Sequence, residues 1–71
     1  MLAFEENDPD IILQSLRTIA QSEGYAELAR KSNISRQTLH RALSHEGNPT
    51  LRSLLNILSG LGFRLKPEVV L

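Results

Sequence analysis

The segment Asn33-Ile34-Ser35 is the feature that most constrains how this 71-residue chain folds. Asn33 belongs to the few residue types that tolerate the left-handed backbone conformation of a tight corner between helices. Ser35 is a preferred N-cap residue, because its hydroxyl accepts a hydrogen bond from a free amide of the next helix. We therefore predict a sharp turn between a helix that ends near Ser32 and one that begins at Arg36.

Capping residues and glycines predict the other helix ends. Asp8-Pro9-Asp10 suits a helix start, with a capping carboxylate, a proline at the first helical position and an acid near the positive end of the dipole. Gly24 is expected to end this first helix and begin the second, and Arg36 to Ser44 forms the third. Thr50 caps a fourth helix, which Gly60 helps to close.

Apolar residues recur at three- and four-residue spacing along each predicted helix, which is the pattern of one buried face. The fourth helix is the most apolar, so we expect it to be the central element of the core, with the alternative that a few leucines at its end cover a dimer interface. The residues expected in the core are Ile12, Leu13, Leu16, Ile19, Ala20, Tyr25, Leu28, Ala29, Ile34, Leu39, Ala42, Leu43, Leu51, Leu54, Leu55, Ile57, Leu58 and Leu61.

Phe63-Arg64-Leu65-Lys66 alternates apolar with basic residues at the period of a strand, just before Pro67. A single strand in a helical domain is an unpaired edge, which favours pairing with a second copy of the chain. Together the elements predict an all-α fold, a compact domain of four helices with a short C-terminal strand. Residues 8–66 form this domain, 1–7 a flexible lead-in and 67–71 a C-terminal tail.

Composition limits the compartment and the chemistry. The chain has no cysteine, so it has neither disulfides nor thiolate ligands. Its apolar runs are far shorter than the roughly 20 residues that cross a bilayer, and its acidic start lacks the basic region of a secretion signal. We therefore expect a cytoplasmic protein with no membrane segment. A domain this small buries only about 60% of its unfolded surface, so a partner or self-association would add stability.

The net charge is zero, but the charges are unevenly distributed along the chain. Up to Glu27 the acidic residues face a single base, Arg17, whereas from Leu28 to Lys66 the basic residues face a single acid, Glu46. Such a division suggests a basic working surface and an acidic segment that serves another partner or solubility. The alternative is that both sets are ordinary solvated helix faces.

Two short helices joined by a three-residue corner are typical of a helix-turn-helix, whose second helix enters the major groove of DNA. Helical spacing turns the polar side chains of that second helix outward. An arginine can form two hydrogen bonds with guanine, and a glutamine two with adenine. We therefore predict base contacts from Arg36, Gln37 and Arg41, which would otherwise be solvated surface.

The remaining candidates suit the DNA backbone. Hydroxyls and free amides at helix N-termini bind phosphate, and basic side chains add an attraction that salt weakens. Thr38 and Ser44 flank the outward face, and His40 is either a phosphate contact or a plain surface histidine. The predicted contacts of this kind are Ser35, Thr38, His40, Ser44, Thr50, Arg30, Lys31 and Arg52, of which Ser35 and Thr50 are also helix caps.

Catalytic or metal chemistry is not indicated. On a continuous helix, His40 and His45 would lie about 140° apart, so they do not share a face. Without cysteine, a His-x-x-x-His pair or a glycine-rich phosphate loop, the local sequence assembles neither a metal site nor an activated nucleophile. We predict no enzyme activity, no cofactor and no metal.

The run from Gly24 to Leu65, GYAELARKSNISRQTLHRALSHEGNPTLRSLLNILSGLGFRL, resembles the addiction-module antidotes, the antitoxin branch of the Cro/C1-type (XRE) helix-turn-helix regulators. The most specific parts are ISRQTLHRALS, GNPT and LGFRL. Two positions depart from the family pattern. Asn33 stands where a glycine is usual, and His40 stands where the residue is often tyrosine.

The resemblance implies a compact lambda-repressor-like fold of four to five helices, in which Arg36 to Ser44 is the recognition helix and Thr50 a phosphate-facing cap. It also implies a homodimer that binds double-stranded operator DNA, represses its own operon and neutralises a small ribonuclease toxin of the RelE/ParE-like type. Such toxins tend to be basic. We therefore expect the toxin contact at the acidic segment Glu5 to Asp10 and on the exposed side of the first helix.

Two other functions stay open at the level of sequence. The same fold serves stand-alone phage-type or metabolic repressors, and a neighbouring gene for a small basic ribonuclease would separate an antitoxin from these. The domain is alternatively a protein-interaction module whose acidic first helix binds a partner. Such a module would show no salt-dependent affinity for DNA.

Overall fold

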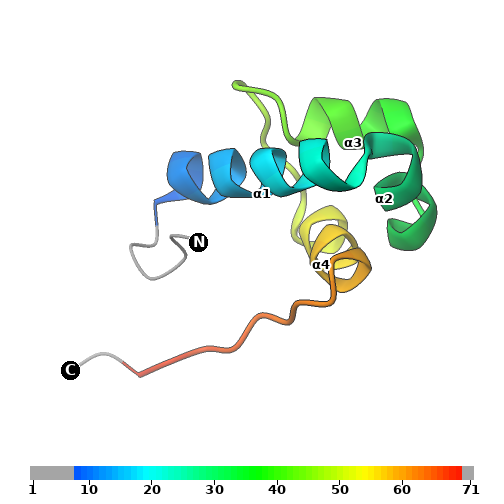
Figure 1. The fold of residues 1–71 in the computed structure, drawn as a ribbon. Helices are drawn as coiled ribbons and strands as arrows, with labels where there is room; N and C mark the ends of the chain where they lie inside the picture. The colour runs from blue at the N-terminus through cyan, green and yellow to red at the C-terminus, as the bar shows by residue number, and fades with distance from the viewer. Residues whose placement is uncertain (1–7, 70–71) are drawn as a thin grey trace.

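The computed structural model describes residues 8–69, and four helices account for most of them (Figure 1). In chain order these are α1 (Pro9–Glu23), α2 (Tyr25–Ser32), α3 (Arg36–Ala42) and α4 (Leu51–Gly60). The all-α prediction is confirmed for this part of the chain, with the lower of the two expected helix counts. No helix within residues 8–69 is both long and apolar enough to cross a bilayer. The predicted flexible lead-in, residues 1–7, lies outside the described residues.

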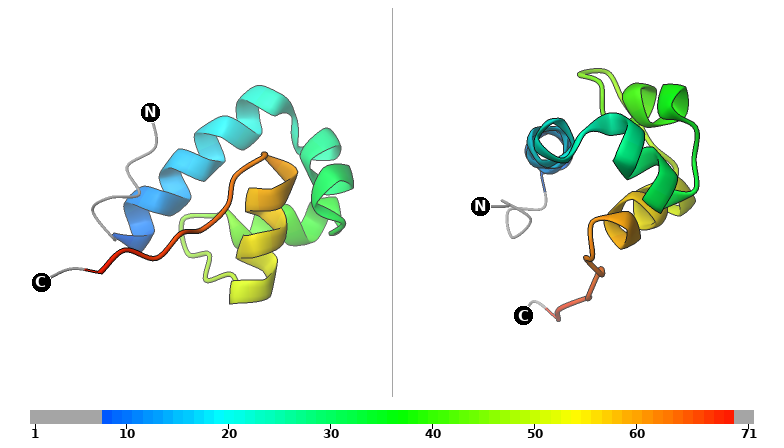
Figure 2. Two further views of the ribbon diagram at one scale, coloured as in Figure 1. Left: turned by 90° about the horizontal axis from the view of Figure 1, so that it is seen from below. Right: turned by 45° about the vertical axis from the view of Figure 1, so that its right-hand side comes forward.

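Capping interactions begin and end α1 where the residue types predict. The Asp8 carboxylate accepts a hydrogen bond from the Asp10 amide at 2.9 Å, and Pro9 lies in the first turn. Gly24 ends the helix with a φ of 96°, a conformation that glycine adopts readily because it has no Cβ. Its amide donates to the Ala20 carbonyl oxygen at 2.8 Å. The chain can therefore start α2 one residue later and in a new direction, as the right-hand view of Figure 2 shows.

Buried leucine and isoleucine side chains from all four helices meet in one core. Burying such a side chain contributes about 1.5–3 kcal/mol, so this cluster is the main apolar source of stability. α2 packs against each of the other three helices and is therefore the central element. The apolar pattern of the sequence predicts this position for the fourth helix, α4. The largest fully buried side chains are Leu16, Leu28, Leu39, Leu43, Ile57 and Leu58.

The prediction that the leucines of α4 lie in the core is wrong for two of them. Leu51 is 66% exposed and Leu55 is 42% exposed, whereas Ile57 and Leu58 are buried. The apolar residues of α4 cover a wider arc of the helix than α2 and its neighbours can cover. Leu51 and Leu55 are four residues apart, so they form an apolar strip on the uncovered side.

The predicted C-terminal strand is not seen in the described residues of the single chain. Residues 63–69, here named the C-terminal segment, leave α4 with no helix or strand assigned, and all of them are exposed. A strand needs a neighbour to complete its hydrogen-bond ladder, and no other segment of residues 8–69 supplies one. Figure 1 shows this segment running away from the helices.

Candidate nucleic-acid interface

The corner between α2 and α3 forms as the residue types predict. Asn33 has φ 58° and ψ 39°, and it is the one non-glycine residue with a positive φ within residues 8–69. Its amide donates to the Arg30 carbonyl oxygen at 3.3 Å, and the Ile34 amide donates to that of Ala29 at 3.2 Å. Ile34 packs against the core. The backbone is therefore held on both sides of the turn, which sets the direction of α3.

Ser35 is the N-cap of α3, which confirms its structural prediction. Its Oγ accepts a hydrogen bond from the Thr38 amide at 3.0 Å and donates to Thr38 Oγ1 at 2.7 Å. These two bonds fix the first turn of the helix. α3 ends at Ala42, two residues before the predicted Ser44. The Leu43 amide still donates to the Leu39 carbonyl oxygen, but the Ser44 amide donates to that of Arg41, three residues back, so the α-helical bonding does not continue.

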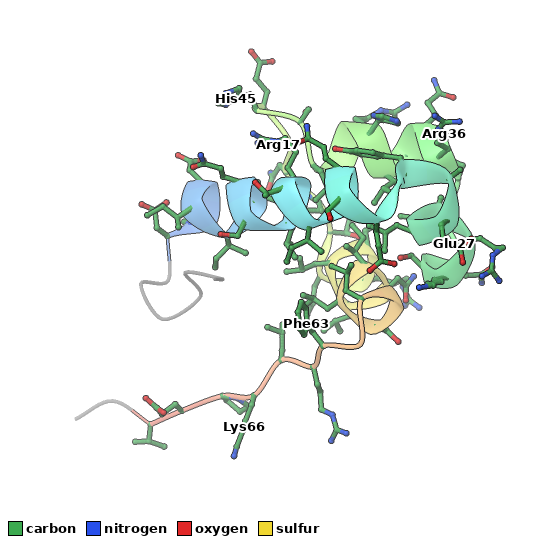
Figure 3. All side chains as sticks on the ribbon, viewed as in Figure 1. Arg17, Glu27, Arg36, His45, Phe63 and Lys66 are labelled. Atoms are coloured by element: carbon green, nitrogen blue, oxygen red, sulfur yellow. The ribbon has the colours of Figure 1, made fainter. Side chains whose placement is uncertain are left out.

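α3 has one buried face and one exposed face. Leu39 and Ala42 lie in the core, together with Leu43 just after the helix. The opposite face carries the predicted base contacts, and Figure 3 shows Arg36 pointing away from the rest of the molecule. Ser44 lies beyond the helix end and its hydroxyl donates to the Arg41 carbonyl oxygen at 2.9 Å. The exposed residues that α3 gathers on this side are Arg36, Gln37, His40 and Arg41.

His40 is stacked on Tyr25, a contact that the sequence analysis missed. The two ring centroids are 3.9 Å apart and the rings are inclined by only 7°. Tyr25 is the first residue of α2, so the stack joins the start of that helix to the middle of α3. The stack restrains the His40 ring, which leaves it less free to contact a base. Periodicity predicts Tyr25 as an inward residue, and only the three-dimensional corner brings the two rings together.

Arg17 was also missed, and it ties α1 to the end of α3. Its Nε donates to the Leu43 carbonyl oxygen at 2.6 Å in a part-buried position. The last carbonyl groups of a helix lack partners within it, and they carry partial negative charge that favours a cation. Arg17 is the one basic residue between Met1 and Glu27, a segment whose other charged residues are acidic. That isolated position is the sequence feature that could have indicated a structural role for it.

The basic side chains of α2 form ion pairs, unlike those of α3. Arg30 bonds to Glu27, and Lys31 Nζ lies 2.9 Å from Glu23 Oε1. The side-chain hydrogen bond from Arg30 lowers the pKa of Glu27, and the same bond raises the pKa of Arg30. Neither pair is deeply buried, so each adds little to stability. Local acids therefore offset the positive charge that Arg30 and Lys31 would bring to a duplex.

The N-terminus of α4 lies beside the exposed side of α3. Thr50 Oγ1 accepts from the Ser53 amide at 3.0 Å, which confirms Thr50 as the N-cap. Arg52, in the same first turn, is exposed. A groove of about 380 Å³ separates the two helices, and its lining includes Thr38, Arg41 and Ser53. Hydroxyl groups, the Arg41 guanidinium and the Glu46 carboxylate thus meet on one concave surface.

Gly47 allows the turn between α3 and α4 to close this groove. A Cβ at this position would lie 2.2 Å from the Ala42 carbonyl oxygen, so a larger residue would push the turn away from α3. The Gly47 amide donates to the Ser44 carbonyl oxygen at 2.9 Å. In the GNPT motif, the glycine is therefore required by close packing against α3, and the threonine caps α4.

Within residues 8–69, the fold and this surface define a small four-helix domain with a polar and basic face on α3. Residues 1–69 match the family described as probable addiction module antidote proteins, and the chain belongs to that family. It is 32% identical over 65 residues to an uncharacterized protein of Haemophilus influenzae, an alignment that covers 92% of this chain and 67% of the other. No solved structure matches the chain.

Proposed function

We propose that this antidote is the antitoxin of a type II toxin–antitoxin module and represses its own operon by binding operator DNA. In this proposal α2 and α3 are a helix-turn-helix of the Cro/C1 (XRE) class within a lambda-repressor-like domain. The observation that carries it is the exposed face of α3, where Arg36, Gln37 and Arg41 stand on a helix held from behind by buried Leu39. A protein with this task works in the cytoplasm, needs no cofactor or metal and has no enzyme activity.

Base recognition is assigned to the side chains of α3 that have the right geometry. Arg36 and Arg41 can each donate two hydrogen bonds to guanine in the major groove, and Gln37 can donate to and accept from adenine. Neither arginine forms an ion pair with another residue of the described chain, so both guanidinium groups are available. α3 is only two turns long, which limits base contact to a few base pairs per copy.

Phosphate contacts are assigned to the groups around these base contacts. Thr38, Arg41 and Ser44 line the groove between α3 and α4, and Thr50 and Arg52 lie at its α4 end. Ser35 caps α3 and the exposed His40 is stacked on Tyr25, outside the lining of this groove. Arg30 and Lys31 contribute less than Arg52, since their charges are offset by Glu27 and Glu23. Contacts of this kind position the protein and weaken as salt increases.

The proposed DNA-bound form is a homodimer on a palindromic operator. Each copy places its α3 in one of two major grooves about 34 Å apart, on the same side of the duplex. A single small domain contacts too few base pairs to select one operator from a genome, whereas two linked copies multiply their selectivity.

The proposed protein partner is a small ribonuclease toxin of the RelE/ParE-like type. Its predicted contact is the acidic segment 5–10 and the exposed side of α1, of which Asp8 and Asp10 lie at the α1 N-terminus. Glu5 and Glu6 lie outside the described residues. Long-range attraction between an acidic segment and a basic ribonuclease would speed their association.

Two experiments test the proposal. Co-expression of a tagged chain with the adjacent reading frame, followed by a pull-down, should recover a small basic ribonuclease and relieve its toxicity. A reporter fused to the upstream promoter should be repressed by the chain, and the Arg36→Ala, Gln37→Ala, Arg41→Ala variant should lose that repression. Absence of a toxin together with intact repression would identify a stand-alone repressor. A bound partner without repression would identify an interaction module.

A further inference from the structure

The C-terminal segment alternates strictly between apolar and charged residues over its whole length. Phe63, Leu65, Pro67 and Val69 fall on one side of an extended chain, and Arg64, Lys66 and Glu68 on the other. The residue before a proline is restricted to extended conformations, so Lys66 favours this backbone. Phe63, Leu65 and Val69 are nevertheless 40%, 44% and 85% exposed. A segment patterned as a half-buried strand therefore has no partner within residues 8–69.

The apolar side of the segment is continuous with the uncovered strip of α4. Phe63 and Leu65 line a shallow groove of about 400 Å³, whose other wall contains Leu55 and Leu58. Leu51 continues the strip at the start of α4. Figure 3 shows Phe63 directed toward α4 and Lys66 directed away from it. Exposed apolar patches of this kind mark sites where another protein packs.

We propose that a second copy of the chain covers this surface, with the two C-terminal segments paired antiparallel about a twofold axis through Lys66. In this register Phe63 lies opposite the partner's Val69, and Leu65 opposite the partner's Pro67. All the apolar side chains then fall on one face of the two-stranded ribbon. That face closes over the grooves beside Leu55 in both copies, as an isologous contact requires.

Pro67 is compatible with this register and with few others. Residues of an antiparallel pair alternate between positions that exchange two hydrogen bonds and positions that exchange none. With Lys66 at a hydrogen-bonded position, Arg64 and Glu68 are hydrogen-bonded too, and Pro67 falls between them. Its missing amide therefore breaks no bond of the ladder. The apolar pairs occupy the non-hydrogen-bonded positions, where side chains approach most closely.

Charge complementarity supports a second copy as the occupant. The register places Arg64 directly opposite the partner's Glu68, and the twofold axis repeats the pair. Glu68 also lies diagonal to the partner's Lys66, which offsets the repulsion between the two lysines on the axis. Glu68 is the one acid after Glu46 in the sequence, and it lies at the position that meets Arg64. The segment thus carries both charges of the ion pair that would join two copies.

Sedimentation equilibrium without DNA tests this interface. We expect the wild type to dimerise, and Arg64→Glu or Glu68→Arg alone to raise the dimer Kd by about tenfold, because each creates two like-charge cross-strand pairs. The combined Arg64→Glu, Glu68→Arg variant should return to within about threefold of the wild type, because the opposite charges are restored. Arg52→Glu and Glu46→Arg make the same charge changes on other exposed positions and should leave the dimer unchanged.

Several results would overturn the interface. These are a wild type that stays monomeric up to its solubility limit, single reversals that leave the dimer intact, and a combined variant that fails to restore it. Protection of the C-terminal segment from hydrogen exchange only in the presence of the toxin would assign the surface to the toxin instead. The use of this dimer on an operator rests on the proposed function, but the dimer itself does not. Failure of DNA binding with an intact dimer would therefore count against the function alone.

Discussion

Two exposed surfaces within residues 8–69 have opposite chemistry. The outer face of α3 presents Arg36, Gln37 and Arg41, which can hydrogen-bond to base edges and phosphates. The uncovered side of α4 and the C-terminal segment present Leu51, Leu55 and other apolar groups, which gain from leaving water. The contrast separates two tasks. One surface suits a duplex and the other a protein.

The two surfaces also differ in how firmly the fold holds them. α3 is fixed by buried Leu39, by the Ser35 cap and by the bond from Arg17 to the Leu43 carbonyl. The C-terminal segment is tied to α4 by the Phe63 amide, which donates to the Leu58 carbonyl oxygen at 2.7 Å. A rigid helix can present side chains in a fixed geometry before DNA arrives. A loosely held segment gains its hydrogen bonds when a partner supplies them.

The largest effect is expected from removing the side chain that anchors α3. Leu39→Ala should cost about 2–5 kcal/mol, which is a large part of the stability of a domain this small. Thermal unfolding followed by circular dichroism should show a largely unfolded protein at 37 °C. The matched control is Leu55→Ala on the exposed strip of α4, measured at protein concentrations at which the wild type is monomeric, where the change should stay within about 0.5 kcal/mol. Equal losses in the two variants would remove the distinction between an anchored and an uncovered surface.

A smaller effect is expected at the corner that orients α3. Asn33→Ala forces a residue with a Cβ and no local hydrogen-bonding group into the left-handed region, which should cost about 1–2 kcal/mol. Asn33→Gly should be neutral or slightly stabilising, because glycine adopts this conformation without strain. Urea unfolding of both variants gives the comparison. An alanine variant as stable as the glycine variant would show that the corner does not depend on the positive φ of residue 33.

The smallest effect is expected at the ion pair of α2. The pKa of Glu27 is lowered in the folded state by Arg30, so the pair stabilises above the unfolded pKa of this carboxyl. That contribution disappears as pH falls through the lowered value. Glu27→Gln should therefore reduce the urea midpoint slightly at pH 7, and the two proteins should converge in acid. A difference that persists after Glu27 is protonated would have a cause other than this pair.

Much of α3 and its surroundings could be predicted from sequence because the signals there are local. Asn33, Ser35 and Thr50 act on amides within a few residues, and their roles follow from residue type. The inward and outward faces of α3 follow from helical spacing. The stack of Tyr25 on His40 and the bond from Arg17 to Leu43 join residues far apart in sequence. No periodic pattern contains that information.

The errors lie where the outcome depends on what covers a surface. The spacing of Leu51 and Leu55 predicts that they lie on an apolar face of α4. It does not show whether another helix of the same chain packs over that face. The alternation over residues 63–66 predicts a strand, but no other segment of residues 8–69 pairs with it. Both errors fall on the same surface, which is the surface proposed to bind a second copy.

The central claim is that the exposed face of α3 contacts operator DNA, and fluorescence anisotropy tests it directly. The probe is a labelled duplex carrying the promoter upstream of the gene, titrated with protein at several salt concentrations. The matched control for the Arg36→Ala, Gln37→Ala, Arg41→Ala variant is Gln21→Ala, Arg30→Ala, Lys31→Ala. The control removes the same charge and one glutamine from exposed positions outside α3.

We expect the α3 variant to bind at least about 100-fold more weakly than the wild type, since each lost base contact costs about 1–3 kcal/mol. Its melting temperature should not fall, because these side chains are exposed and alanine favours helix. The control variant should lose less than about tenfold, with a modest change in salt dependence. Wild-type affinity in a folded α3 variant would contradict the account.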